Sequence, residues 1–177
     1  MDHSPTTEPA LPGPLDFLDF AAARGGQLYR TAYLLTGGDS HLAEDLVQEA
    51  LSRMYSRWKR LSRLENPAGY AQTVLVNTFV SLRRRRSSGE RVTAEFAEVA
   101  VTDRDPTLRL TLLDALRELS APDRAVLVLR FWEDRSVEET AAALRLTSTA
   151  VRSRSHRALG RMRALLGDDF AERADAP

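Results

Sequence analysis

The sequence predicts an all-α protein made of two small helical domains joined by a flexible linker. Apolar residues recur every three or four positions along two long stretches, as on the buried face of a helix. No stretch shows the strict apolar and polar alternation of a half-buried strand. Between the two stretches, residues 88–105 have little periodicity, and we expect them to form the linker. The length of 177 residues suits one domain or two small ones.

The N-terminal part begins with a leader and a first helix. Residues 1–14 contain four prolines among small and polar residues, so we expect a disordered leader. A helical pattern starts at Asp16 and stops at Thr36, which two glycines follow. Gly25 and Gly26 interrupt this pattern, and each costs about 1 kcal/mol inside a helix. A single kinked helix and two shorter helices are therefore both compatible with the sequence.

Two further helices complete a first domain that spans residues 15–87. One begins with Ser40 as its cap and fades near Leu64. The other runs from Pro67, a residue type that suits the first turn of a helix, to about Arg86. It ends in four consecutive arginines, and cations are favoured at the C-terminal end of a helix.

The second domain, residues 106–167, is predicted to be helical throughout. Ser120 and Ser136 each precede an acidic residue three positions later, which is typical of a helix start. Thr147 can cap a last helix that Gly167 ends, and residues 168–177 are expected to form a tail. The predicted helices span 106–119, 120–132, 136–144 and 147–166.

The charges are balanced in number but uneven in position. The chain has 25 basic and 25 acidic residues, so its formal net charge is zero. Residues 51–91 nevertheless carry a net charge of +8, and residues 145–163 carry +6. Such segments predict two anion-binding surfaces, although two solvated helix faces would have the same composition. Lys59 is the only lysine, which indicates a GC-rich genome and also suits phosphate recognition by arginine.

Composition excludes several classes of function. The chain has no cysteine, which rules out disulfides, thiolate metal sites and thiol chemistry. Its histidines lie far apart, and no catalytic grouping, glycine-rich phosphate loop or metal-spaced carboxylate pair is present. No apolar run is long enough to cross a membrane, and no signal peptide is recognisable. We expect a cytoplasmic protein that is not an enzyme, with no cofactor, no metal and no membrane contact of its own.

The segment from Ser136 to Leu159 predicts a helix-turn-helix, because a short capped helix precedes a three-residue turn and a longer basic helix. Hydroxyl groups at the start of the second helix can meet a phosphate, and arginines on its polar face can reach guanine in the major groove. A hairpin with a solvated arginine face is the alternative, but residues 145–163 contain six basic and no acidic residues, which favours DNA contact. The predicted DNA-contacting residues are Thr147, Ser148, Thr149, Arg152, Ser153, Arg154, His156 and Arg157.

Two polar strips mark the first domain. One follows the helix from Pro67 at four-residue spacing and suits contacts with a nucleic-acid backbone and a few bases. Its members are Asn66, Thr73, Asn77, Ser81, Arg83, Arg84, Arg85 and Arg86. The other strip lies on the preceding helix and consists of Asp45, Gln48, Glu49 and Ser52. A solvated face would explain this acidic strip, but beside a basic helix it looks like a protein-docking surface.

Segments in both domains resemble the extracytoplasmic-function (ECF) sigma factors, the minimal two-domain branch of the sigma-70 family. In the first domain these are residues 43–50 (AEDLVQEA), 67–77 (PAGYAQTVLVN) and the arginines that follow. In the second they are residues 119–130 (LSAPDRAVLVLR), 136–144 (SVEETAAAL) and 151–159 (VRSRSHRAL). Together, in this order and separation, they are specific. The arginine-rich composition is similar to that of actinobacterial members.

The resemblance implies a role in transcription initiation. The acidic strip would bind the β′ coiled coil of core RNA polymerase, and the β flap is a further expected contact on the polymerase. The helix from Pro67 would read the −10 promoter element, with a flipped base held near residues 61–67 and Asn77 beside it. The helix-turn-helix would read the −35 element. The linker would let both domains engage promoter DNA, and would let an anti-sigma factor wedge between them.

The sequence departs from the usual family pattern at four positions. Arg145 stands where a glycine is usual, Thr149 and Ala150 replace a Gly-Thr pair, and Ser155 replaces an apolar residue. These changes bear on −35 preference and not on the fold. Two other readings stay open: a stand-alone helix-turn-helix transcription regulator, which would need a dimerisation surface, and an adaptor without DNA function, which the basic segments disfavour.

Overall fold

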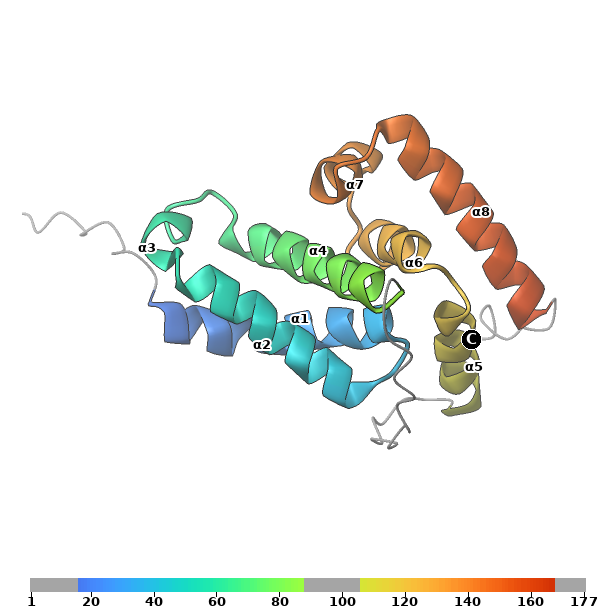
Figure 1. Ribbon diagram of the computed structural model, residues 1–177, viewed down its shortest axis with the longest axis horizontal. Coiled ribbons are helices and arrows are strands. Elements are labelled where there is room, and N and C mark those ends of the chain that lie inside the picture. The colour runs from blue at the N-terminus through green and yellow to red at the C-terminus, as the bar shows by residue number, and fades with distance from the viewer. Residues whose placement is uncertain (1–15, 88–105, 168–177) are drawn as a thin grey trace, which may run out of the picture.

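The computed structural model describes residues 16–87 and 106–167, and the predicted leader, linker and tail lie outside these ranges. The described residues are helical and contain no strand, which confirms the all-α class (Figure 1). The helices are α1 (Phe17–Thr36), α2 (Ser40–Tyr55), α3 (Trp58–Leu61), α4 (Pro67–Ser87), α5 (Pro106–Arg117), α6 (Ala121–Leu127), the π-helical η1 (Val128–Trp132), α7 (Val137–Leu144) and α8 (Ser148–Leu166). We call residues 16–87 the first half and residues 106–167 the second half.

Helix α1 is continuous through its two interior glycines, which decides between the two alternatives that the sequence left open. Asp16 caps its start, where the Asp16 carboxylate accepts from the Leu18 N–H at 3.1 Å. At its end, Gly37 has a φ of 71°, a left-handed conformation that glycine adopts without a steric penalty. The helix therefore begins and ends where its capping residues predicted.

Helix α2 differs from the sequence prediction at both ends. Its cap is Asp39, whose carboxylate accepts from the Leu42 N–H at 2.9 Å, while Ser40 is the first helical residue and is buried. The helix stops at Tyr55 instead of continuing to Leu64, and the short helix α3 follows. This break brings the Trp58 ring to 4.7 Å from the Phe20 ring, measured between centroids, so aromatic packing accompanies the change of direction.

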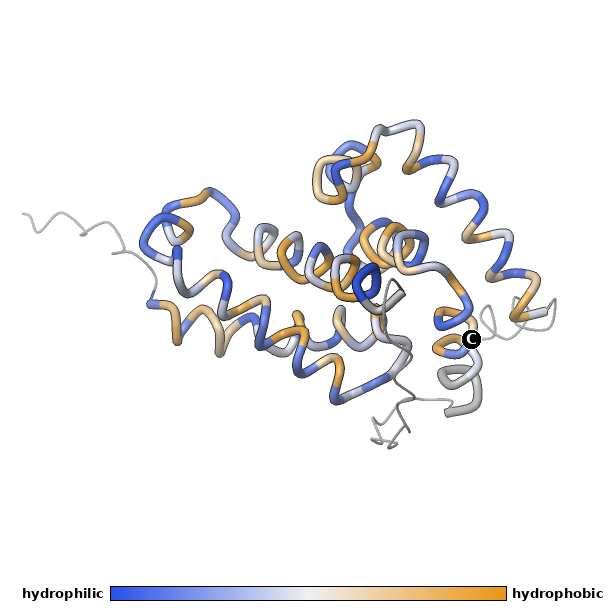
Figure 2. The backbone as a smooth tube through the Cα atoms, in the orientation of Figure 1, coloured by the Kyte–Doolittle hydropathy of each residue, from blue (hydrophilic) through white to orange (hydrophobic). Residues whose placement is uncertain are grey.

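The first half packs α1, α2 and α4 side by side (Figure 1). Hydrophobic positions recur along these helices (Figure 2), and those that are buried form one cluster. Leu35, Met54, Leu75 and Phe79 are fully buried there. Val76 is also fully buried, although it lies outside the stripe at four-residue spacing that Ala71, Leu75 and Phe79 form. Two sides of helix α4 are therefore covered, and the first half covers only one of them.

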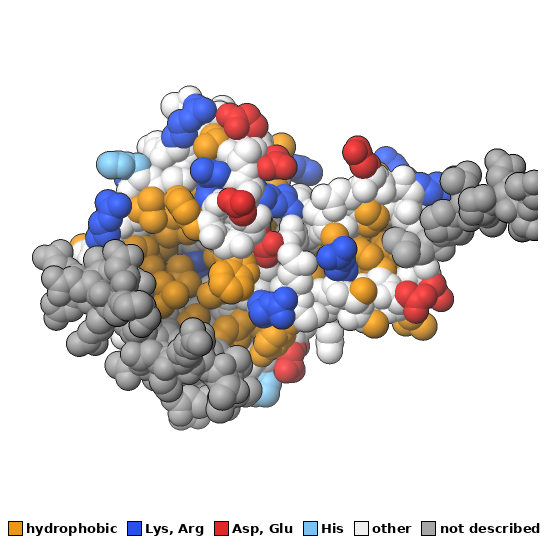
Figure 3. Space-filling model, turned by 180° about the vertical axis from the view of Figure 1, so that it is seen from behind, with side chains coloured by type: hydrophobic (Ala, Val, Ile, Leu, Met, Phe, Trp, Pro, Cys, Tyr) orange, Lys and Arg blue, Asp and Glu red, His pale blue; other side chains and the backbone are white. Residues whose placement is uncertain are grey.

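The second half covers the remaining side of α4. Ala125, Val128, Leu129 and Ala143 join the same buried cluster as the core of the first half. Smaller clusters hold α5, α6 and α8 together and seat α7 against α8, and apolar side chains gather in a hollow on the rear face (Figure 3). The two predicted bundles are present, but in this structure they share one continuous core.

Candidate nucleic-acid and protein-docking surfaces

The helix-turn-helix is formed by α7, a turn and α8. A capping box starts α7, in which the Glu139 N–H donates to the Ser136 hydroxyl at 3.0 Å and the Ser136 N–H donates to the Glu139 carboxylate at 2.7 Å. The hydrogen bond from the Ser136 backbone is the main cause that lowers the pKa of the Glu139 carboxyl. The sequence signature of this cap is therefore confirmed in atomic detail.

The turn places a non-glycine residue in a left-handed conformation. Arg145 has a φ of 55° and a ψ of 45°, so it absorbs the strain of a position where a glycine would be relaxed. The Leu146 N–H then donates to the Ala141 carbonyl at 2.9 Å and closes the turn. Thr147 caps α8, because its hydroxyl accepts from the Ala150 N–H at 3.1 Å. Ala141 and Val151 pack together where the two helices cross.

The polar face of α8 is mostly open to solvent. Ser153, His156 and Arg157 are exposed, as are Thr147 and Thr149 at the start of the helix, and Ser148 is half-buried. Arg152 is also exposed and lies 3.4 Å from the Glu138 carboxylate, with side-chain exposures of 63% and 68%. A pair this exposed contributes little, so the Arg152 guanidinium can exchange its partner for a phosphate or a base.

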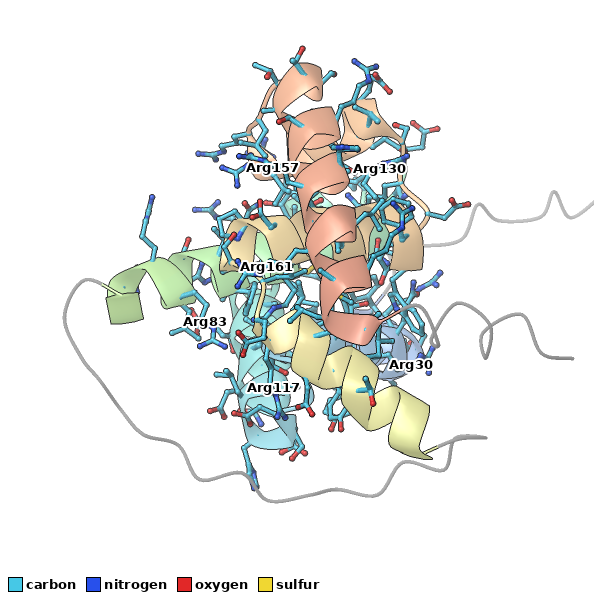
Figure 4. All side chains as sticks on the ribbon, turned by 90° about the vertical axis from the view of Figure 1, so that its right-hand side faces the viewer. Arg30, Arg83, Arg117, Arg130, Arg157 and Arg161 are labelled. Carbon is cyan, nitrogen blue, oxygen red and sulfur yellow. The ribbon has the colours of Figure 1, made fainter. Side chains whose placement is uncertain are left out.

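Arg154 faces the protein and not the open face of α8. Its guanidinium donates to the Asp123 carboxylate of α6 at 2.8 Å, and both side chains are largely covered. Arg154 therefore joins α8 to α6, which separates it from the other predicted contacts on this helix. Figure 4 places Arg157 and Arg161 along one side of α8, one helical turn apart. Arg161 is exposed there and was absent from the predicted set.

The predicted strip on α4 has two different environments. Asn66 caps the helix, with its side-chain oxygen accepting from the Gly69 N–H at 2.7 Å. Thr73 and Asn77 lie under the second half and are hydrogen-bonded to it. Ser81 is half-buried, and Arg84 and Arg85 are exposed. Arg83 lies over the Phe79 ring at 5.9 Å, and the side chain of Arg86 lies outside the described side chains.

The acidic strip on α2 borders a groove. Asp45, Gln48, Glu49 and Ser52 are exposed, and all four line a hollow of about 540 Å³ between α2 and α4. Arg85 lines the opposite wall, and Glu49 pairs with Arg53 at 2.7 Å. The groove is thus open to solvent, with the acidic strip of α2 on one side and Arg85 of α4 on the other. The sequence predicted the acidic side of this groove but not the basic wall.

A second hollow lies between the halves and is basic. It has a volume of about 840 Å³, and its lining includes Arg53, Arg57, Arg84 and Arg145 together with Asn77. The sequence assigned no role in binding to Arg53, Arg57 or Arg145, and only the net charges of their segments hinted at one. Three of these arginines come from the first half and one from the turn of the helix-turn-helix, so only the fold brings them together.

The described residues contain no group of three potential metal ligands. No helix among them is both long and apolar enough to cross a membrane. Two arginines of the second half donate to backbone carbonyls of the first half: Arg124 to Leu35 and Arg135 to Gly69. Arg130 lies beside them and donates to the Arg135 carbonyl.

Comparison with known proteins assigns the chain to a family. Residues 21–89 match sigma-70 region 2, and residues 109–162 match sigma-70 region 4. The RNA polymerase sigma-E factor of Streptomyces coelicolor is 37% identical over 163 residues, which cover 90% of this chain and 92% of that protein. This chain belongs to the sigma-70 family. The ECF RNA polymerase sigma factor SigL of Mycobacterium tuberculosis is 32% identical, over 78% of this chain and 82% of that protein. Such relatives place the chain in the ECF group.

A solved structure extends the likeness of this ECF family member to the fold. The sigma factor RpoE of Bartonella quintana, in complex with the anti-sigma factor NepR, superposes with a TM-score of 0.66 at 26% identity. The match covers 87% of this chain and 98% of that one. The helices of regions 2 and 4 described above are therefore arranged as in a known sigma factor.

Proposed function

We propose that this chain is an ECF sigma factor that binds core RNA polymerase and directs promoter-specific transcription initiation. The observation that carries this function is the pair of sigma regions in one chain, the second presenting an exposed arginine face on a capped helix-turn-helix. Sigma factors are non-catalytic initiation factors. We place the protein in the cytoplasm, and we assign residues 15–87 and 106–167 to its two functional domains, with residues 88–105 as their linker.

The −35 element is assigned to the outer face of α8. Arg152, Ser153, His156 and Arg157 are exposed on it, and two of them carry guanidinium groups that can donate to guanine in the major groove. The capped start of α8, from Thr147 to Thr149, is suited to a phosphate because its backbone N–H groups lack helical partners. We assign Arg154 a positioning role, since its ion pair with Asp123 holds α8 against α6.

The −10 element is assigned to α4 and the loop before it. A hollow of about 670 Å³ opens beside this loop, and Leu64, Asn66, Tyr70 and Thr73 line its first-half wall. The Tyr70 side chain, at 36% exposure, can stack on an unpaired base. Unstacking a base costs a few kcal/mol, which such a contact recovers. The arginines at the end of α4 are placed to meet backbone phosphates.

Core polymerase is assigned to the acidic strip on α2, with its β′ coiled coil as the partner and its β flap as a further expected contact. An exposed strip of four polar residues beside a groove offers hydrogen bonds and charge to a helical partner. An anti-sigma factor is a further expected partner, because the similar RpoE structure contains one.

Runoff transcription tests this function. Core polymerase with the purified chain should produce transcripts from selected promoters that core polymerase alone does not produce. Arg152→Ala should weaken −35-dependent initiation by about 1–3 kcal/mol, because one guanine contact is lost. Arg30→Ala is the matched control, since Arg30 is exposed on α1, away from the assigned surfaces. Absence of added transcripts would contradict the sigma function, and equal activity on a scrambled −35 element would contradict the α8 assignment.

A second experiment addresses the docking strip. The double substitution Asp45→Ala with Gln48→Ala should reduce co-purification with core polymerase while leaving helicity unchanged. The double substitution His41→Ala with Glu44→Ala changes two exposed residues of the same helix that do not line the groove, and it should retain binding. Equal retention of both variants by core polymerase would overturn the assignment.

A further inference from the structure

The basic hollow between α2, α4 and the turn of the helix-turn-helix has the composition of a site for a phosphate-rich ligand. Its volume of about 840 Å³ is that of an ordinary small-molecule site. Four arginines line it, and they are Arg53, Arg57, Arg84 and Arg145. No acidic side chain is among the described residues that line it. The wall therefore gathers positive charge that no carboxylate of the same wall offsets.

Apolar and aromatic side chains complete the wall of the basic hollow. Val74 and Val80 of α4 line it, as does Leu144 of α7. Tyr70 also lines it, and its side chain is 36% exposed. Small-molecule sites typically combine an apolar wall with a few convergent polar groups, and a planar base can stack on a tyrosine ring. The hollow can thus hold a phosphate chain on its arginines and a base on its apolar part.

Each of the four arginines also lies near the C-terminal end of a helix. Arg53 and Arg57 flank the end of α2, Arg84 belongs to the last turn of α4, and Arg145 follows α7. The last carbonyls of a helix carry partial negative charge, which stabilises a cation there without any ligand. This effect explains the residue type at each end. It does not require that the arginines of three helices line the same hollow.

Arg145 gives an independent reason to expect a ligand. Its φ of 55° is a left-handed conformation that is unfavourable for a residue with a Cβ, and a glycine would be relaxed there. Among the described residues, no carboxylate pairs with its exposed side chain. A strained residue whose side chain has no partner within the fold is a candidate for function. The hollow that Arg145 lines is where this side chain would act.

The first-half arginines are available to a ligand as well. Arg53 pairs with Glu49 at 2.7 Å, but the two side chains are 47% and 53% exposed. An ion pair this exposed contributes little, so a phosphate can replace the carboxylate. Arg57 is exposed, and no carboxylate of the described residues pairs with it. Guanidinium groups bind phosphate oxygens in pairs of parallel hydrogen bonds, which favours a ligand with several phosphates.

We propose that the basic hollow binds a small ligand that carries a polyphosphate chain, with Arg53, Arg57, Arg84 and Arg145 as its phosphate contacts. This site goes beyond the proposed sigma function. It shares Arg84 with the −10 strip, but the other three arginines belong to no surface assigned to DNA or to core polymerase. Because a longer chain meets more of the guanidinium groups at once, affinity should rise with the number of phosphates.

Calorimetric titration of the full chain with inorganic tripolyphosphate tests the site. At an ionic strength of about 0.15 M without divalent cations, one ligand should bind per chain, at least about tenfold more tightly than orthophosphate. Arg57→Ala and Arg145→Ala should each weaken binding about tenfold, because each removes one charged contact. Arg30→Ala and Arg161→Ala remove exposed arginines that do not line the hollow, and they should leave the affinity unchanged.

Arg145→Gly separates the site from the stability of the fold. It removes the guanidinium and also the backbone strain, so this variant should be at least as stable as the unchanged chain and yet bind tripolyphosphate as weakly as Arg145→Ala. Unchanged affinity of both Arg145 variants would overturn the proposal. Equal weakening by Arg30→Ala or Arg161→Ala would also overturn it, because the ligand would then be attracted to the basic surface in general.

Two further ligands distinguish the sources of the polyphosphate. Adenosine triphosphate that binds as tightly as tripolyphosphate would assign the site to the inorganic chain. Tighter binding that Tyr70→Ala abolishes would assign it to a nucleotide, and either result supports the site. A single-stranded oligonucleotide of unrelated sequence with the same charge is the third ligand. If it binds more tightly than tripolyphosphate and depends on Arg57 and Arg145, the hollow belongs to a DNA path and the proposal is overturned.

The outcome for this site is independent of the outcome for transcription. A chain that produces promoter-specific transcripts but binds no tripolyphosphate would overturn the ligand site and leave the sigma function intact. A chain that binds tripolyphosphate through Arg57 and Arg145 but yields no transcripts would support the site and contradict the sigma function. Thermal unfolding gives a second readout, since a ligand that binds only the folded chain raises its melting temperature. Arg145→Ala should reduce that increase, and Arg161→Ala should not.

Discussion

Arg124 is a buried cation that connects the ends of two helices. It is 3% exposed, and its guanidinium donates to the carbonyls of Leu35 at 2.8 Å, Arg117 at 2.8 Å and Leu119 at 3.2 Å. Carbonyls at the end of a helix lack backbone partners and carry partial negative charge. Burial, helped by the nearby Arg83 and Arg117, lowers the pKa of Arg124 to about 10, so the group remains charged at neutral pH.

Replacing Arg124 should destabilise the protein. Arg124→Ala leaves three buried or half-buried carbonyls without this donor, and we expect the free energy of unfolding to fall by about 2–3 kcal/mol. Urea denaturation followed by circular dichroism measures the change. Arg161→Ala, at an exposed position of α8, should change it by less than about 0.5 kcal/mol. Equal stability of the two variants would show that the carbonyl contacts contribute nothing.

Arg145 stores backbone strain at the turn of the helix-turn-helix. Its φ of 55° is unfavourable for a residue with a Cβ, and glycine removes that cost while gaining some unfolded-state entropy. Arg145→Gly should therefore raise the free energy of unfolding by up to about 1 kcal/mol. Arg145→Ala is the control, because it removes the same guanidinium but keeps the strain. Thermal unfolding compares the two, and a glycine variant no more stable than the alanine variant would disprove the strain.

Helix α4 shows what an apolar stripe can and cannot predict. Its length, its start after the Asn66 cap and the burial of Ala71, Leu75 and Phe79 were all predictable from periodicity and capping. The burial of Val76 was not, because a second partner covers that side. Periodicity indicates which face is most apolar, but a helix covered on two sides buries residues outside this face.

The capping box of α7 makes the stability of this helix depend on pH. The lowered pKa of Glu139 means that its carboxylate stabilises the folded state above the unfolded pKa, and that this contribution is lost as the pH falls through the lower folded value. Wild type should therefore exceed Glu139→Gln in melting temperature at pH 7, and the difference should shrink toward pH 3. Glu138→Gln, a neighbouring exposed carboxylate paired with Arg152, is the control. A difference that is constant with pH would contradict this cap.

The shared core predicts that the two halves unfold together. The chain has two tryptophans, Trp58 in the first half and Trp132 in the second. Trp132→Phe and Trp58→Phe each leave one fluorescent reporter, and both reporters should unfold at the midpoint given by circular dichroism of the same variant. Glu133→Ala with Arg135→Ala removes side-chain hydrogen bonds between the halves and should separate these midpoints. Midpoints that differ by more than about 0.5 M urea while Glu133 and Arg135 are intact would contradict a single cooperative unit.

The charge distribution has a consequence at the scale of the whole molecule. Basic segments with net charges of +8 and +6 are offset by acidic ones elsewhere, so the total is zero. The sequence-independent attraction of the free chain to DNA is therefore small, and specific binding depends on correct placement of both halves. Part of the acidic remainder, on α7 and before it, faces the proposed base pocket.

The sequence by itself determined most of the helices and their caps, the helix-turn-helix and the sigma-70 membership, because capping, periodicity and motif order act over a few residues or survive as local patterns. Only the tertiary structure decided that the halves share a core, that Thr73 and Asn77 bind the second half, and that Arg154 pairs with Asp123. These contacts join residues far apart in the chain. Their formation depends on how two apolar surfaces dock. The spacing of residues within one helix does not indicate which other element that helix packs against.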